Sequence, residues 1–426
     1  VKTLRAPWVL VNLFFTFIIQ ITAIGWVFFR TRVKKPNQQA FFFAADSNGD
    51  DRENEIYQNL ADGGPVLLVR RNSTISLNKM FAGMECFTIC DQKDGLFGLL
   101  EIPKIIKFII WDSLCLFRHF YGLPSALFYQ VAALPFRRAI LRGFFNCYRP
   151  KYYWGRDDYN VEHTLRRDEL NHVGGKSFGI NHGTIVECFI RGEFRYINFD
   201  QYYVFGRGIH TAEMKKRWSS DMKVVPAGSF GATREDFKLR FKKRPPNILF
   251  CIGFFITMEE CVELIRSVAK EFSDRKILLQ LKPSFNNTAT GKNFISACLD
   301  NNPNIENVIG SPIQSFSKVQ YSFSDPSTTI QEAIQFGLKS FCLDLSPIQK
   351  HSIYRGFTDL CISSAEQAIG RIRSLESGKW DYPLEKYSDL IDLSGKVFID
   401  RLREDVGLLA KEAAKPLINK EVIQKK

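Results

Sequence analysis

The sequence predicts an α/β protein with two domains, each built on a parallel sheet, preceded by an apolar helix. Three observations predict this. The chain has 426 residues, more than one hydrophobic core usually organises, so we expect two core-forming domains of roughly 150 to 250 residues each. Short apolar runs alternate with helical patterns, as in sheets covered by helices. The segment Ala6–Phe29 contains no charged residue.

This first segment is about as long as a helix needs to be to cross a ~30 Å hydrocarbon layer. Trp8 and Trp26 lie near its ends, where aromatic residues mark membrane interfaces, and a basic cluster at 30–35 follows. The positive charge predicts that the rest of the chain lies on the cytoplasmic side of the inner (plasma) membrane. Polar residues such as Asn12 and Gln20 keep a second interpretation open, a helix that lies on the membrane or is buried in the protein.

The charge balance predicts anionic partners. There are 58 Lys and Arg residues against 45 Asp and Glu residues, a net charge of +13. Between 102 and 151 the basic residues alternate with aromatic and aliphatic ones, and a helix is expected at 126–145. This mixture favours an anionic bilayer over nucleic acid, although an ordinary packed helix is an equal alternative. The ten cysteines form no Cys-x-x-Cys pair, which is typical of reduced thiols.

The remaining elements follow in chain order. In the first half, apolar runs with intervening turns predict strands at 40–45, 66–69, 86–90, 152–154, 177–181, 201–205 and 223–226. The charged, proline-containing stretch 242–247 is the expected linker. In the second half the pattern predicts strands at 248–252, 276–282, 319–323 and 340–343, and helices at 258–272, 293–301, 329–336 and 365–374. Ligands of such sheets bind at the carboxyl ends of the strands.

The most informative segment is Ser324–Ala333, in which a turn rich in hydroxyl groups leads directly into a helix. Such a turn offers phosphate oxygens free backbone N–H groups, hydroxyl groups and the positive end of a helix. Glu332 lies one turn inside the helix, where its carboxylate can accept a sugar hydroxyl. The simpler alternative is a helix N-cap formed by Ser327, with Glu332 completing a capping arrangement.

The order of strand, Ser-rich turn, Glu-Ala helix, Gly337 and a strand ending in Asp344 resembles the donor half of GT-B glycosyltransferases. The blocks Trp154–Asn160, Lys176–Thr184, Phe199–Gly206 and Val225–Ser229 are similar to the acceptor half of enzymes that build capsule, O-antigen and lipopolysaccharide. The resemblance spans about 150 to 370. It implies two Rossmann-like domains facing a cleft. The expected divisions are a membrane-associated segment (1–35), an acceptor-side domain (36–244), a donor domain (245–395) and a C-terminal helix (396–426).

The resemblance also implies residue roles. Many relatives carry His-Pro after the second strand of the donor domain, whereas this chain has Lys282-Pro283, whose ammonium group can meet a diphosphate as a fixed cation. The implied donor-binding residues are Lys282, Ser324, Ser327, Thr328, Thr329, Glu332 and Asp344. The candidate bases are Asp157, Asp158 and His182. The implied acceptor-side residues are Arg156, His163, Arg166, Gly183 and Glu187.

The implied function is transfer of a sugar from a nucleotide-sugar to a lipid-linked or polysaccharide acceptor, without a cofactor. Metal dependence is not expected, because the chain lacks the Asp-x-Asp motif of the other large glycosyltransferase fold. Three alternatives stay open: a sugar-nucleotide epimerase, a polyol-phosphate transferase, and a non-catalytic glycan-assembly protein. The apolar segment argues against the epimerase, which needs no membrane anchor.

Overall fold

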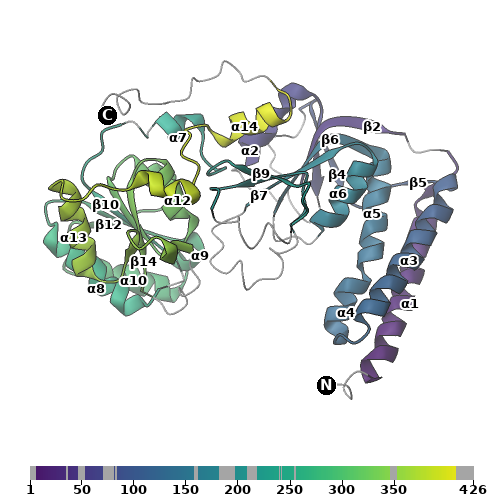
Figure 1. Ribbon diagram of the computed structural model, residues 1–426, viewed down its shortest axis with the longest axis horizontal. Coiled ribbons are helices and arrows are strands. Elements are labelled where there is room, and N and C mark those ends of the chain that lie inside the picture. The colour runs from purple at the N-terminus through teal and green to yellow at the C-terminus, as the bar shows by residue number, and fades with distance from the viewer. Residues whose placement is uncertain are drawn as a thin grey trace. The chain divides into compact units, whose positions relative to one another are not determined.

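The protein consists of two compact α/β units (Figure 1). The computed structural model describes residues 6–34, 37–46, 53–70, 81, 84–157, 162–181, 197–208, 218–238, 240, 242–253, 256–345 and 353–408. The first unit comprises Val1–Ile180, Ile197–Gln201 and Asp221–Lys223, and the second comprises Asn181–Tyr196, Tyr202–Ser220 and Val224–Lys426. Two parallel-sheet α/β units and an N-terminal apolar helix confirm the predicted fold class.

The second unit is built on a six-stranded sheet of order β12-β11-β10-β13-β14-β15. Its strands are β10 (Ile248–Ile252), β11 (Ile277–Leu281), β12 (Ile305–Asn307), β13 (Tyr321–Ser324), β14 (Lys339–Leu343) and β15 (Cys361–Ile362). All neighbours in this sheet run parallel. Strand order reverses between β10 and β13, because the chain builds outward from β10 to β12 and then crosses back to β13. This switch point is where such sheets bind ligands.

Burial on both faces explains the apolar strands of this sheet. Every residue of β10 and β11 is buried, and the rings of Phe250, Phe323 and Phe341 stack across three neighbouring strands. The surrounding helices are α8 (Met258–Glu271), α9 (Pro283–Asn286), α10 (Ala289–Leu299), α11 (Pro312–Phe316), α12 (Thr328–Gln335) and α13 (Ala365–Glu376). The strands and helices predicted for this half are all present, with ends shifted by a few residues.

The other sheet has seven strands in the order β4-β3-β2-β6-β7-β8-β9. They are β2 (Gln39–Asp46), β3 (Val66–Arg70), β4 (Phe87–Asp91), β6 (Tyr148–Asp157), β7 (Lys176–Ile180), β8 (Gln201–Val204) and β9 (Lys223–Pro226). Strand order again reverses, between β2 and β6, and β4, β3, β2, β6 and β7 run parallel. A register shift in β6 between Trp154 and Arg156 gives Arg156 a positive φ of 48°.

Shorter elements complete both units. They are β1 (Thr31–Arg32), β5 (Phe97–Gly98), α2 (Asn54–Leu60), α6 (His163–His172), α7 (Arg234–Lys238) and 3-10 helices at Ala61–Gly63, Leu99–Glu101, Ile353–Gly356 and Leu384–Asp389. Helix α14 (Phe398–Asp405) returns to β8: the Tyr203 hydroxyl donates to Asp405 Oδ2 at 2.8 Å, and the Tyr203 and Phe398 rings lie 5.1 Å apart.

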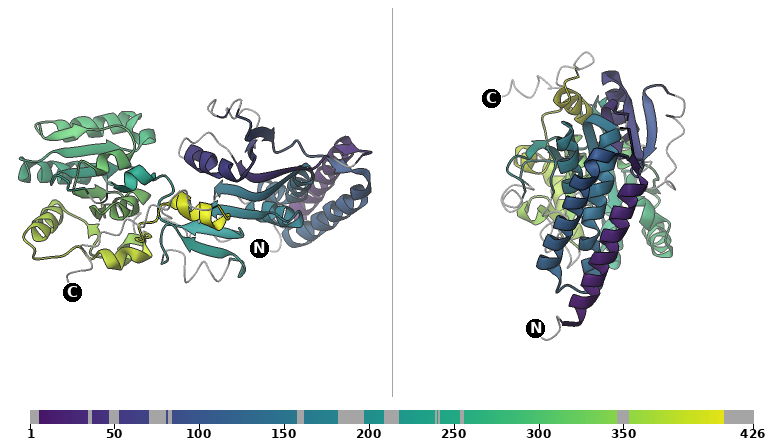
Figure 2. Two further views of the ribbon diagram at one scale, coloured as in Figure 1. Left: turned by 90° about the horizontal axis from the view of Figure 1, so that it is seen from above. Right: turned by 90° about the vertical axis from the view of Figure 1, so that its right-hand side faces the viewer.

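Four helices of the first unit pack together: α1 (Ala6–Phe29), α3 (Ile102–Phe120), α4 (Ser125–Ala132) and α5 (Leu134–Cys147). We call α1, α3 and α4 the helical layer; α1 runs alongside α3 and α4 (Figures 1 and 2). The expectation of a single helix at 126–145 is wrong, because the chain breaks between Ala132 and Leu134. Pro135 lies in the first turn of α5, where its missing N–H costs nothing. In the interior of one continuous helix it would interrupt the hydrogen bonding.

Candidate active site

A cavity of about 190 Å³ opens at the carboxyl ends of β10, β11 and β13, at the switch point of the six-stranded sheet. Five of the predicted donor-binding residues line it together: Lys282, Ser324, Ser327, Thr328 and Thr329. They come from two different strand ends, because Lys282 follows β11, whereas Ser324 ends β13 and the other hydroxyl residues follow it. The fold therefore gathers one ammonium group and four hydroxyl groups around one space.

The Ser327 side chain does not act as the N-cap that the simpler alternative expects. Ser327 occupies the N-cap position of α12 with an extended backbone but makes no side-chain capping bond. Its hydroxyl lies 3.0 Å from that of Ser324, and its carbonyl oxygen accepts a 2.7 Å bond from the Tyr354 hydroxyl. The N-terminal turn of α12 therefore faces the cavity without a Ser327 cap across it, which suits a bound anion.

Lys282 is held at its position by the backbone on both sides. Its N–H donates to Ile252 O at 2.8 Å, at the end of β10, and Pro283 then begins α9. The side chain is exposed at the carboxyl edge. A Lys at this point supplies a compact positive charge on a flexible stem, which can follow a phosphate group.

Sequence reasoning missed the cavity residues Asp325, Gly253 and Gln280. The Asp325 side chain is buried beside Gly253, where a Cβ atom would lie 2.7 Å from Asp325 Oδ2. Burial, together with the negative charges of Asp325 and Glu332, raises the pKa of the Cys251 thiol. Gln280 was visible as the one polar residue of β11, and its amide donates to Gly310 O at 2.6 Å, holding the opposite wall.

The two other predicted donor-binding residues have partners of their own. Glu332 Oε1 accepts a 2.8 Å hydrogen bond from the Ser229 hydroxyl. Asp344 forms an ion pair with Arg355 at 3.2 Å and lines a separate hollow with Cys361 and Gln367. The structure thus groups five of the seven donor residues around the cavity and leaves these two beside it.

The candidate bases lie at the carboxyl edge of the seven-stranded sheet or beyond the described residues. Asp157 is the last residue of β6 and is paired with Ile180, the last of β7. In the sequence, Asp158 comes directly after β6 and His182 comes two positions after β7. Asp158, His182, Gly183 and Glu187 lie outside the described residues, so their roles stay predictions.

Three predicted acceptor-side residues are buried in the first unit. Arg156 Nε lies 2.7 Å from Glu53 Oε1, and Arg166 Nη1 lies 3.0 Å from Asp46 Oδ2. The Tyr57 hydroxyl donates to Glu53, and burial and this carboxylate raise the pKa of Tyr57 well above its usual value.

The third residue, His163, packs its ring 4.3 Å from that of Phe199. These contacts give all three side chains a structural role. Contact with an acceptor stays a prediction.

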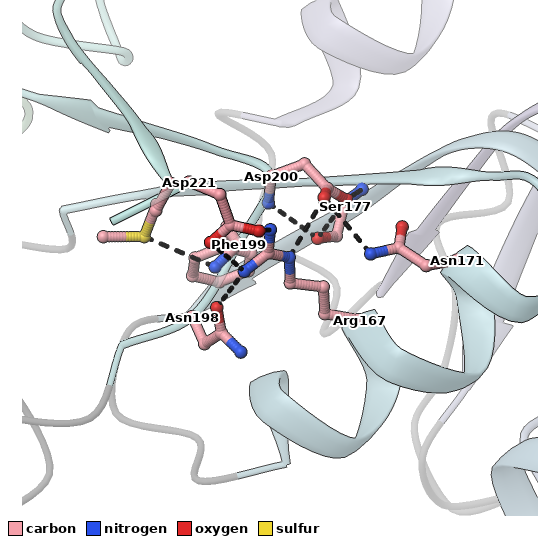
Figure 3. Close-up of polar contacts among 8 residues, drawn as sticks. Arg167, Asn171, Ser177, Asn198, Phe199, Asp200 and Asp221 are labelled. Carbon is pink, nitrogen blue, oxygen red and sulfur yellow. Dashed lines mark hydrogen bonds and ion pairs between the residues drawn. The ribbon is translucent and has the colours of Figure 1, made fainter. Parts of the chain in front are cut away.

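A second polar cluster, centred on Arg167, lies at the amino ends of the strands (Figure 3). Arg167 donates to Asp200 at 3.0 Å and to Asp221 at 2.7 Å, and it also bonds Asn198. Asp200 Oδ2 accepts bonds from both the N–H and the hydroxyl of Ser177. The cluster joins α6 to the starts of β7, β8 and β9, at the sheet edge opposite to the ligand edge, so its role is structural.

A wider hollow, of about 1000 Å³, lies between α8 and α10 on the outside of the second unit. None of the predicted site residues that the structure describes lines it. Among the described residues, no three His, Cys, Asp or Glu side chains gather as a metal site needs. Metal independence stays a prediction.

No protein-family model and no curated protein matches the sequence. Solved structures similar to the chain include a UDP-glucosyltransferase from Polygonum tinctorium (13% identity, 88% of this chain and 98% of that one, TM-score 0.46). Others are a glycosyltransferase from Rickettsia africae (11%, 92% and 100%, 0.44) and MurG from Acinetobacter baumannii (10%, 86% and 99%, 0.43). With TM-scores under 0.5, these similarities assign no activity, and the chain's own residues carry the function proposed below.

Proposed function

We propose that the protein is a glycosyltransferase that binds a nucleotide-sugar at the carboxyl edge of the six-stranded sheet and transfers the sugar to a lipid-linked or polysaccharide acceptor. The observation that carries this proposal is the cavity at the switch point, where Lys282 and the hydroxyl groups of Ser324, Ser327, Thr328 and Thr329 meet the N-terminus of α12. Cations, hydroxyl groups and helix N-termini are the groups that bind phosphate in proteins.

The size of the cavity supports the diphosphate as its proposed occupant. Pockets that enclose a whole ligand usually measure about 300 to 1,000 Å³, and this one measures about 190 Å³. The nucleoside and the sugar then extend from it along the sheet edge. Glu332, one turn further into α12, is the proposed acceptor of a ribose or sugar hydroxyl.

The sugar and the diphosphate of the donor have different roles in the proposed reaction. The acceptor oxygen forms a bond to the anomeric carbon as the bond to the diphosphate breaks, and the nucleoside diphosphate leaves with the electron pair. Lys282 and the α12 N-terminus stabilise the charge that develops on the leaving group. A base removes the acceptor proton if configuration inverts. Asp157, Asp158 and His182 are the proposed candidates for this base.

The acceptor class and the location are also proposals. The resemblance of the segments between 150 and 370 to enzymes of capsule and lipopolysaccharide synthesis supports a role in bacterial surface polysaccharide assembly. Helix α1 supports association with the cytoplasmic face of the inner membrane, since among the described residues it is the one helix long and apolar enough to cross a bilayer. A protein held at the membrane stays close to a lipid-linked acceptor.

The test is donor binding, measured with two lysine variants at opposite ends of one strand. Detergent-solubilised protein is melted with UDP-, GDP-, CMP-, CDP- and dTDP-linked sugars, because a ligand that binds only the native state raises Tm. We expect one nucleotide class to raise Tm, Lys282→Ala to abolish that shift, and Lys276→Ala, at the exposed amino end of β11, to preserve it.

No shift with any donor well above typical affinities would remove the donor-site assignment, as would an unchanged shift in Lys282→Ala. Stabilisation by CDP-linked donors alone would transfer the proposal to a polyol-phosphate transferase.

A further inference from the structure

We propose that the helical layer docks on an anionic lipid bilayer lengthwise, with α1 lying in the membrane surface rather than crossing it. This extends the membrane association in the proposed function and does not depend on the transfer chemistry. This orientation is supported by the two faces of α1, the ion pairs beside it, the closed turn between α3 and α4, and the basic residues nearby.

The outward face of α1 is apolar apart from Thr22, whose hydroxyl bonds Ile18 O of the same helix. Phe14 and Phe17 are 60% and 59% exposed. The other large apolar side chains exposed on this helix are Trp8, Leu10, Val11, Leu13, Ile18, Ile21, Phe28 and Phe29. Neighbouring helices also expose large apolar side chains, Trp111 on α3 and Leu127 and Tyr129 on α4. So many exposed apolar side chains mark an interaction site rather than an ordinary water-exposed face.

The inward face of α1 is occupied by the protein itself. Ala23 and Val27 belong to one buried cluster with Ile109 of α3 and Ala139 of α5. Next to Ala139, Arg138 forms ion pairs with Asp112 of α3 at 2.7 Å and with Glu169 of α6 at 2.8 Å.

These ion pairs disfavour a crossing orientation of the packed helix. If α1 crossed the bilayer with its packing intact, Asp112, Arg138 and the ends of α3 would be drawn toward the hydrocarbon. Each charge at the centre of a bilayer costs about 2.5 to 3.5 kcal/mol on insertion scales. Lying in the surface, α1 buries its outward face and leaves these charges in water.

The turn between α3 and α4 is closed in the way that a dry environment requires. The buried Asn12 amide donates to Tyr121 O and to Leu123 O, each at 2.8 Å, and its oxygen accepts from the Ser125 hydroxyl at 3.1 Å. The carbonyl groups of the turn are thus satisfied within the protein, as a turn next to lipid requires.

Charge complementarity selects an anionic surface. Lys104, Lys107 and Arg118 lie on the exposed stripe of α3 that also carries Trp111, and the exposed Arg32 and Lys34 follow α1. Basic residues next to an apolar helix face contribute about 1 kcal/mol each near anionic headgroups. Their long side chains can reach the headgroups while apolar neighbours enter the acyl region.

The experiment uses the full chain with a protease-cleavable tag before Val1, made by cell-free synthesis with sealed vesicles already present. Vesicles of phosphatidylcholine alone, or with 30% phosphatidylglycerol, are floated and then treated with protease from outside. We expect co-flotation that is stronger with phosphatidylglycerol, and cleavage of the tag, because both ends of an in-plane α1 remain outside. Phe14→Glu and Phe17→Glu should each reduce co-flotation at least 5-fold.

Ile309→Glu is the matched control, because Ile309 is 83% exposed in the second unit, and it should float like the unmodified chain. Circular dichroism and melting in detergent show that each variant is folded. A protected tag would mean that α1 crosses the bilayer. That result would overturn the proposal, as would absence of flotation, equal flotation on both vesicle types, or an equal loss in Ile309→Glu.

Discussion

The Ser229 hydroxyl donates a 2.8 Å hydrogen bond to Glu332 Oε1, so the loop after β9 fixes the carboxylate that stands one turn inside α12. The backbone of the same residue is also held by α12, because Ser229 N–H donates to Gln335 Oε1 at 3.0 Å. A Cβ atom at Gly228, whose φ is +70°, would collide with the Gln335 amide. Glu332 and Gln335, on consecutive turns of α12, therefore both hold this loop in place.

Glu332→Ala is expected to weaken donor binding while leaving the fold intact. Loss of a hydrogen bond between a carboxylate and a ligand hydroxyl costs about 1.5 to 3 kcal/mol, or roughly 10- to 100-fold in Kd. Ser229→Ala should act in the same direction but by only about 1 kcal/mol, because it loosens the carboxylate without removing it. Titration calorimetry with the donor identified by melting measures both. Unchanged donor affinity in Glu332→Ala would remove the residue from the site.

Gly253→Ala is expected to disturb the cavity wall. The new methyl group would lie 2.7 Å from Asp325 Oδ2, so the buried carboxylate must move, at a cost of about 1 to 3 kcal/mol in the free energy of unfolding. Donor affinity should fall as well. Gly370→Ala is the control: nothing lies within 4 Å of its Cβ position in α13, and Ala should stabilise that helix by up to about 1 kcal/mol. Equal melting of the two variants would contradict the crowding at Gly253.

Arg167→Ala is expected to lower stability without changing donor affinity. The guanidinium group is almost fully buried and joins the half-buried Asp200 to the exposed Asp221, so its removal leaves Asp200 without its cation, at a cost of about 1 to 3 kcal/mol. Denaturant titration measures the loss. Arg266→Ala breaks an exposed pair with Asp300, which is worth at most about 1 kcal/mol. A similar loss in both variants would show that the Arg167 cluster does not stabilise the unit.

Asn12→Ala is expected to destabilise the helical layer, because Tyr121 O and Leu123 O lose their donor. Buried groups left unsatisfied cost about 1 to 3 kcal/mol each, so melting in detergent should shift clearly downward. Thr22→Ala, whose hydroxyl bonds only Ile18 O on an exposed face of the same helix, should melt like the unmodified chain. A normal melting temperature for Asn12→Ala would mean that water replaces the amide.

The sequence predicted most of the second unit because its information is local. Apolar strands such as β10 and amphipathic helices such as α8 show their burial in the spacing of their residues, and parallel order then places the ends of β11 and β13 at one edge. The Lys282 and Ser327 positions follow from that order alone. Asp325 and Gln280 do not, because their importance comes from contacts with Gly253 and Gly310 across loops, which no spacing rule describes.

The first unit was harder to predict for a related reason. Arg156 and Arg166 carry charges typical of a binding surface, yet they pair with Glu53 and Asp46 from segments about 100 residues earlier. Sequence patterns do not distinguish an arginine that meets a ligand from one that meets a distant carboxylate. The break before α5 was missed because the apolar pattern continues through it, and Pro135 fits the first turn of a new helix as well as the end of an old one.

The packing of α14 against β8 joins segments that are synthesised at different times. Tyr203 is made 202 positions before its partner Asp405, and Phe205 O is made long before the N–H of Asp392 that donates to it. On the ribosome, β8 therefore emerges long before its cover, and the whole six-stranded sheet is made in between. Contacts so distant in sequence form slowly. A nascent chain that stalls shortly before residue 398 lacks the Phe398 ring, so the Tyr203 ring stays uncovered and accessible to chaperones.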